Sequence, residues 1–292
     1  MDTREIAEEI ASHLDGLDIP NLLWGQTAHL YHLGLRSSPR DGPRVVEIAV
    51  SEHRIDAAFR HICAKYSVAQ CDNAECCPEP QPDYHCHIED GSKSGETTIS
   101  LHRMPTVLTD LDTEIPNNPN SGDSNYVLVT DERLPNCSSD GSSGNHQGTL
   151  CVNRKRTARI LTLARHTESL ILRLCLNLNR NNAPAFFTTI EQIVAYYGEN
   201  AQYTGIWEQL LCDLDNKNDS YGKYLKKQKD DWKHEDLDPE SWQDCAIRNC
   251  KRSTERMKHT QHLRDELVND GKLPSDRKID SFDEVTPNTG HQ

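Results

Sequence analysis

The sequence predicts an α+β protein, in which a small mixed β-sheet with flanking helices is followed by a helical C-terminal domain. Three observations lead to this fold class. Short runs rich in β-branched residues alternate with helical patterns up to about residue 150. From Thr157 onward, apolar residues recur at helical spacing. The final residues are polar, with few apolar anchors. We therefore expect an α/β domain over residues 1–150, a helical domain over 155–268 and a disordered tail over 269–292.

The first half of the chain alternates helical and extended patterns. Residues 2–14 and 21–33 are the first two expected helices, because their apolar residues recur at helical spacing. Residues 44–50, RVVEIAV, have the composition of a strand, with Glu47 in its middle. An apolar stripe over 54–66 predicts a third helix. Further strands are expected at 84–88, 97–101 and 126–130.

The second half of the chain is helical in pattern and shows no internal repeat. Residues 157–178 carry a long apolar face, which predicts one strong helix. Two more helices are expected at 189–197 and 203–214. Residues 219–268 are charged and helix-forming, with a few large apolar residues as anchors.

Charge and cysteine usage limit the classes of function. The formal net charge of −14 argues against non-specific binding to DNA, which needs a basic surface. No apolar run is long enough to cross a membrane, and the acidic N-terminus is unlike a secretion signal. The 11 cysteines are therefore expected as reduced thiols or metal ligands, in the cytoplasm, with the nucleus as the alternative.

The densest cluster of metal-ligand residues is CDNAECCPEPQPDYHCH, residues 71–87. Zinc takes four tetrahedral ligands from thiolate sulfur and imidazole nitrogen. Cys71 and Cys76 lie in one loop, and His85 and His87 point to the same face of a strand, since they are two residues apart. These four are the candidate ligands of a structural zinc ion, with Cys77 as an alternative to Cys76. A loop of free thiols and a redox pair are the other readings.

Several short motifs occur in an order that is typical of one family. They are Trp24-Gly25, the cysteines from Cys71 to Cys77, His85-Cys86-His87, Ile99 to His102, and Asp131 to Pro135. In this order the chain resembles small nucleotidyltransferase-like proteins, and more closely an uncharacterised group of fungal proteins of that type. The resemblance spans about residues 20–215, and it implies a nucleotidyltransferase-like fold with a ligand site in the cleft between the two domains.

Active proteins of this type carry Gly-Ser on a turn and two acids, Asp-x-Asp, on the next strand. Here Gly-Ser is absent, Val45 stands at the first acid position and Glu47 at the second. Asp41 and Glu89 are the remaining candidates for catalytic acids. The resemblance therefore implies a catalytically degenerate protein that binds a ligand or partner. The alternatives are an active, Mg²⁺-dependent nucleotidyltransferase acting on a small molecule or RNA, and a zinc-stabilised interaction protein without a nucleotide site.

A basic run at the start of the second half offers a phosphate contact. Arg154 and Lys155 are the candidate ligand-binding residues, and a solvated helix face is the alternative reading. The P-loop, Rossmann and Gly-x-Ser-x-Gly motifs are absent. The expected partner is an unknown small molecule or nucleotide.

Overall fold

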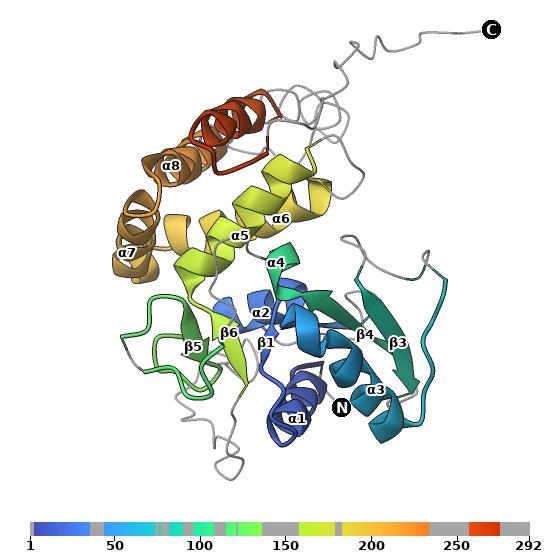
Figure 1. Cartoon of the computed structure of the whole chain (residues 1–292). Helices are drawn as coiled ribbons and strands as arrows, with labels where there is room; N and C mark the ends of the chain where they lie inside the picture. The colour runs from blue at the N-terminus through green and yellow to red at the C-terminus, as the bar shows by residue number, and fades with distance from the viewer. Residues whose placement is uncertain are drawn as a thin grey trace, which may run out of the picture.

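A computed structural model describes residues 3–35, 44–73, 76, 82–89, 96–107, 115–120, 122–135, 158–178, 183–233 and 257–274. Its centre is a six-stranded sheet in the order β3-β4-β2-β1-β6-β5 (Figure 1). The strands are β1 (Asn21–Leu23), β2 (Arg44–Val50), β3 (Tyr84–Glu89), β4 (Glu96–Arg103), β5 (Tyr126–Leu128) and β6 (Arg159–Leu161).

The strand pairings make the sheet mixed. β2 runs parallel to β4, and β1 runs parallel to β6. The pairs β1–β2, β3–β4 and β5–β6 are antiparallel. This sheet, its flanking helices and the helical second half confirm the predicted fold class.

One face of the sheet packs against α1 (Thr3–Asp15) and α3 (Ile55–Tyr66). Val46, Ile48 and Val50 of β2 are in the hydrophobic core on this side. Side chains alternate along a strand, so Glu47 and Ala49 point to the opposite face. Ala49 belongs to the second core, which the C-terminal helices complete.

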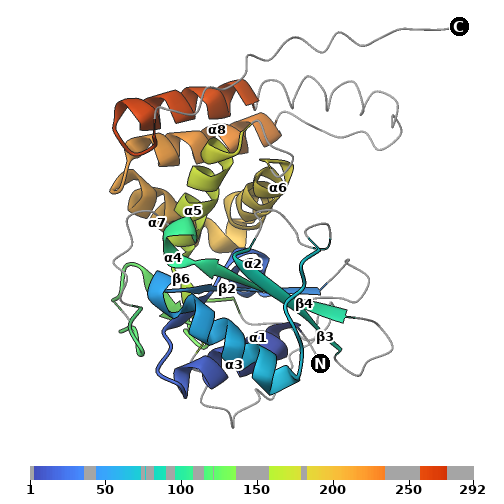
Figure 2. The ribbon, with the colours of Figure 1, turned by 45° about the vertical axis from the view of Figure 1, so that its right-hand side comes forward.

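The opposite face carries α4 (Met104–Val107) and the helical half of the chain. That half comprises α5 (Leu163–Leu176), α6 (Ala183–Ile193), α7 (Thr204–Asp215), α8 (Asp219–Lys233) and a further helix over 257–269. The short helix α2 (Gly25–His32) contacts both sides, through Tyr31 to Glu8 of α1 and through His29 to Gln192 of α6. Figure 2 shows these helices stacked on the side of the sheet away from α1 and α3. Among the helices described, none is both long and apolar enough to cross a membrane.

Two expected helices begin with a strand instead. Residues 21–33 form β1 and then α2, and residues 157–178 contain β6 followed by α5. In each case three residues, as β1 or β6, pair with neighbouring strands, so sheet hydrogen bonds replace a first helical turn. β6, the last strand along the chain, thus lies within residues 155–268, the range expected for the helical domain. Most of the expected tail, 269–292, is outside the described residues.

Candidate metal site and ligand pocket

Four side chains converge beside the edge strand β3. Cys71 and Cys76 come from the segment after α3, and His85 and His87 come from β3. One ligand atom from each residue lies within 4.8 Å of the other three. Within the described ranges, no other group of three or more potential ligands comes this close. These are the four residues that the sequence predicted as ligands, and together they could hold a metal ion.

The distances inside this Cys/His cluster suit zinc. Cys76 Sγ lies 3.4 Å from Cys71 Sγ, 3.4 Å from His85 Nε2 and 3.2 Å from His87 Nε2. Ligand atoms around one tetrahedral zinc ion would be about 3.3–3.8 Å apart, given the usual Zn–S and Zn–N bond lengths. The three distances from Cys76 are therefore close to those of a tetrahedral zinc site, and the remaining ligand pairs lie within 4.8 Å.

Neighbouring groups hold the ligands in place. His87 Nδ1 lies 3.1 Å from Thr98 Oγ1 on β4, and the other ring nitrogen, Nε2, faces the Cys76 sulfur. The backbone N–H of Cys71 donates to the carbonyl of His85 at 3.0 Å, which ties the loop to the strand. Partners of this kind orient metal ligands and fix the histidine tautomer.

Glu47 lies at the N-terminus of α2, where its carboxylate serves as a helix cap. Glu47 Oε2 accepts a hydrogen bond from the backbone N–H of Gln26 at 2.5 Å. Trp24, at the N-cap position, has no side-chain oxygen for this role. Gly25 is essential to the approach, because a Cβ at this position would lie 2.3 Å from Glu47 Oε2. The acid expected in catalysis therefore already satisfies an N–H of this helix end.

Burial shapes the protonation of Glu47 and its neighbour His102. Burial raises the pKa of Glu47 to about 7, and the Gln26 N–H partly opposes this shift. Burial, and secondly the charge of Arg173, lowers the pKa of His102 to about 3. Glu47 Oε1 and His102 Nε2 lie 3.9 Å apart. Because His102 is neutral at pH 7, the two do not form an ion pair.

The structure does not bring Glu47 and Glu89 together. Glu47 aligns with Ser100 on β4, and Ser100 aligns with His85 on β3. Glu89 is exposed and lies four positions further along β3, which is about 13 Å along the strand and two strands away. Asp41, Arg154, Lys155 and the alternative ligand Cys77 are outside the described residues.

Three buried histidines lie between the sheet and the C-terminal helices. We call His29 and His32 of α2 and His166 of α5 the histidine cluster. The ring of His166 stacks on His32 at 5.0 Å and on His29 at 6.1 Å between centroids. Burial lowers the pKa of His29 to about 4 and of His32 to about 3, and it lowers that of His166 well below 6.5. All three rings are neutral at pH 7.

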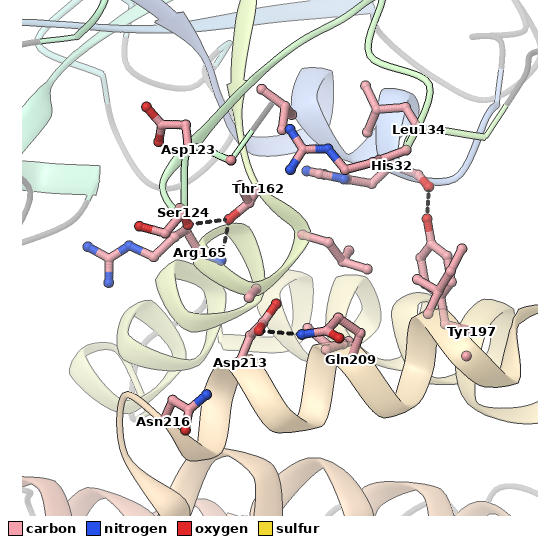
Figure 3. A pocket seen from close by; sticks show the side chains of 18 of the residues that line it. His32, Asp123, Ser124, Leu134, Thr162, Arg165, Tyr197, Gln209, Asp213 and Asn216 are labelled. Carbon is pink, nitrogen blue, oxygen red and sulfur yellow. Dashed lines mark hydrogen bonds between the residues drawn. The ribbon is translucent and has the colours of Figure 1, made fainter. Parts of the chain in front are cut away.

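A pocket of about 720 Å³ opens next to this cluster. Its walls are the segment around β5, the start of α5 and one side of α7. Figure 3 shows Asp123, Ser124 and Thr162 on one side and Gln209 and Asp213 of α7 facing them. A volume of this size suits a small organic ligand. The pocket lies between the sheet and the helices, in the kind of position where the sequence predicted a ligand site.

Sequence reasoning did not identify the histidine cluster or the residues of this pocket. One signal was present, because His29 and His32 are three residues apart and so share one face of a helix. The partner, His166, follows almost 140 positions later, and only the packing of α2 against α5 joins them. Pocket residues such as Asp123 and Asp213 come from polar segments that look like ordinary surface.

Comparison with known proteins gives one weak structural likeness. No protein-family model matches the sequence, and no curated protein matches it significantly. An antigenic nucleotidyltransferase-like protein from Paracoccidioides brasiliensis matches 77% of this chain and 92% of its own, with 9% sequence identity and a TM-score of 0.41. At this level of similarity, membership of the nucleotidyltransferase-like family stays a prediction from the sequence.

Proposed function

We propose that the chain is a zinc-stabilised, catalytically degenerate nucleotidyltransferase-like protein that binds a ligand between its sheet and its C-terminal helices. The observation that carries the loss of catalysis is the environment of Glu47. Nucleotidyl transfer uses metal ions that bridge the triphosphate and the attacking oxygen, and Mg²⁺ prefers several carboxylate and water ligands. Glu47 is buried and accepts a hydrogen bond from the Gln26 N–H, and Glu89 is remote from it.

The start of α2 is also a poor phosphate site. A helix N-terminus attracts anions, because its first N–H groups point outward and its dipole is positive there. In this protein a carboxylate of the chain itself, that of Glu47, occupies that position. An incoming phosphate would have to displace the Glu47 carboxyl group from the Gln26 N–H and would then lie beside this acid.

Nucleotide binding and turnover test this part of the proposal. We expect no change in melting temperature with any of the four NTPs and Mg²⁺, and no release of pyrophosphate. A ligand that binds the folded state would raise the melting temperature by mass action. A shift with Mg²⁺–NTP that is lost in Glu47→Gln would contradict the proposal and favour the active nucleotidyltransferase. Glu47→Gln keeps an oxygen that can cap α2, so it should still fold.

The proposed role of the zinc ion is structural. All four ligands would come from the protein, which leaves no open position for a substrate or a catalytic water. The sequence before β3 is rich in proline and polar residues, so it has few apolar side chains that could fix its conformation without a metal. Elemental analysis should find zinc in the wild type and in Cys212→Ser, an exposed cysteine outside the cluster, but not in Cys71→Ser.

A reducing compartment suits this chemistry. The cysteines within the described ranges are free thiols, and zinc binding needs Cys71 and Cys76 unoxidised. We therefore propose a cytoplasmic or nuclear protein. Fluorescence microscopy of a tagged full-length chain would test the location, and secretion into the medium would contradict it.

A further inference from the structure

We infer that the pocket between β5 and α7 selects a ligand with an apolar body and a cationic head, such as an amine, and disfavours phosphorylated ligands. This inference rests on the proposed ligand-binding role and adds the chemical class of the ligand. It follows from three features of the pocket: its apolar wall, its balance of charge, and a buried imidazole at its inner end.

The apolar wall is formed mainly by α5 and α7. Leu163 and Leu210 line the pocket, and Ile206 lies at its edge with 37% of its surface exposed. Ile206 is one of three large apolar side chains that are exposed within the described ranges, with Leu17 and Leu35, and it is the one of the three that lines this pocket. Together these side chains offer a surface that an aromatic or aliphatic ligand body would cover.

The charges around the pocket favour a cation. Asp123, Glu132 and Asp213 line the pocket, and Lys217 is the lining cation without an acidic partner in the described structure. The two lining arginines each pair with an acid outside the pocket lining, and the charge of Asp123 also acts on Arg133. Arg133 makes two hydrogen bonds of 2.8 Å to Asp131, and Arg165 pairs with Glu168. Asp123 Oδ1 accepts from the backbone N–H groups of Asn125 and Tyr126, and Asp213 Oδ1 accepts from Gln209 Nε2, but these neutral donors leave both negative charges in place. The carboxylates thus outnumber the available cations, and the net charge of −14 adds a field of the same sign.

The third feature is His32, at the inner end of the pocket near Tyr197 (Figure 3). Its ring is fully buried, and neither ring nitrogen reaches a partner with normal hydrogen-bond geometry. The nearby backbone carbonyl of Leu161 raises the pKa of His32, but burial lowers it by more. A neutral imidazole has one nitrogen that accepts a hydrogen bond. Leaving a buried polar atom without a hydrogen bond costs free energy. A ligand N–H that donates to the acceptor nitrogen of His32 would remove this cost.

A matched set of three probes tests the inference. Tryptamine, tryptophol and indole-3-acetate share an indole body and differ in a cationic, neutral or anionic head. Isothermal titration calorimetry of the full chain should give tryptamine an affinity at least tenfold higher than that of indole-3-acetate. The preference should shrink several-fold in Asp213→Asn, which removes one carboxylate without changing the shape of the side chain.

A blocking variant locates the binding. Gly205 lines the pocket near the start of α7, and a Cβ at this position would meet no atom within 4 Å. Gly205→Ala should therefore fit without a collision and keep the binding of tryptamine, whereas the larger side chain of Gly205→Trp should fill part of the pocket and abolish it.

The outcomes separate the inference from the proposed ligand-binding role. Equal binding of the three probes, or tighter binding of indole-3-acetate, that is lost in Gly205→Trp would overturn the cation preference and leave the pocket as a ligand site. Binding that Gly205→Trp does not affect would overturn the inference by locating the probes elsewhere. No binding of any probe would count against the pocket as a ligand site and against the inference with it.

Discussion

Gly25 is the residue at which the Glu47 cap leaves no room for a side chain. Its φ is +55°, and an added Cβ would lie 2.3 Å from the Glu47 carboxylate. Gly25→Ala should lower the free energy of unfolding by about 2–4 kcal/mol, because left-handed backbone strain and the collision with Glu47 add together. Chemical denaturation followed by circular dichroism would measure the loss.

Gly271 provides the matched control for Gly25. Its φ is +68°, but an added Cβ would meet no atom within 4 Å. Gly271→Ala should therefore lose only the backbone part, about 1 kcal/mol. Equal losses in the two variants would mean that Glu47 does not press against Gly25, and the capping role of Glu47 would then be wrong.

At the scale of single residues, sequence reasoning brought together the Cys/His cluster but misassigned the context of Glu47. His85 and His87 could be placed on one face because alternation along a strand is a local rule. The cap could not be foreseen, since the expected helix over 21–33 placed Gly25 in mid-helix. Only when Asn21–Leu23 pairs as β1 does the helix begin at Gly25 and leave N–H groups for Glu47 to satisfy.

At the scale of elements, the short strands β1 and β6 show where local pattern fails. Each is three residues long and runs directly into a helical sequence. Asn21–Leu23 pairs with both β2 and β6, so the hydrogen bonds of its neighbours decide its conformation. Longer strands with clear alternation or β-branched runs, such as β2 and β4, could be predicted from their own residues.

The packing of α2 against α5 predicts acid sensitivity. The histidine cluster and His102 have pKa values lowered by burial, so they are neutral when folded but bind protons below about pH 6.5 when unfolded. Stability is therefore lost as pH falls from about 6.5 toward 4, by about 1.4 kcal/mol per pH unit for each group. Glu47 has a raised pKa, so its contribution to stability increases as pH falls from about 7 to 4.5. This single group opposes the four histidines and offsets only part of their effect.

A variant of α5 tests this pH dependence. His166→Leu removes one titrating group from the cluster, so the slope of unfolding free energy between about pH 6 and 5 should fall by about 1.4 kcal/mol per pH unit. An unaltered slope in His166→Leu would show that this ring does not titrate with unfolding.

Two glycines inside helices should respond in opposite directions to alanine. At Gly205 in α7, a methyl group would meet open space, so Gly205→Ala should raise the free energy of unfolding by up to about 1 kcal/mol through helix propensity. At Gly222 in α8, the added Cβ would lie 1.8 Å from Asp215 Oδ1, so Gly222→Ala should lower it. Thermal denaturation of the two variants side by side would check both signs, and a destabilised Gly205→Ala would argue against open space in the pocket.

At the scale of the whole molecule, the Cys/His cluster lies at one edge of the sheet. β3 is an edge strand, and the segment with Cys71 bonds to its outer side through the His85 carbonyl. An open edge strand invites pairing with another chain. Holding this segment against β3 with zinc would both stabilise the fold and cover the edge.

Removing the metal should therefore change stability and association together. Dialysis against a strong zinc chelator should lower the melting temperature by about 5 °C or more, because metal binding energy becomes folding energy. Light scattering should show larger particles than before dialysis, through the exposed edge of β3. Restoring zinc should reverse the first effect, whereas unchanged melting after complete removal would mean that the ion has no structural role.

The overall architecture could be predicted from the sequence because its halves differ in pattern. The first half carries strand-like runs and the second half carries helical spacing, which is enough to place a sheet before a helical region. The pocket could not be predicted residue by residue. It depends on how α7 lies against the segment around β5, two parts of the chain about 80 positions apart.

Native mass spectrometry of the purified chain tests the central claim, that a zinc ion joins the segment after α3 to β3. The account predicts a mass increment of one zinc ion per chain in the wild type and in Cys212→Ser. It predicts no increment in Cys71→Ser. A folded, fully reduced wild-type chain that carries no metal, even after incubation with zinc, would contradict it.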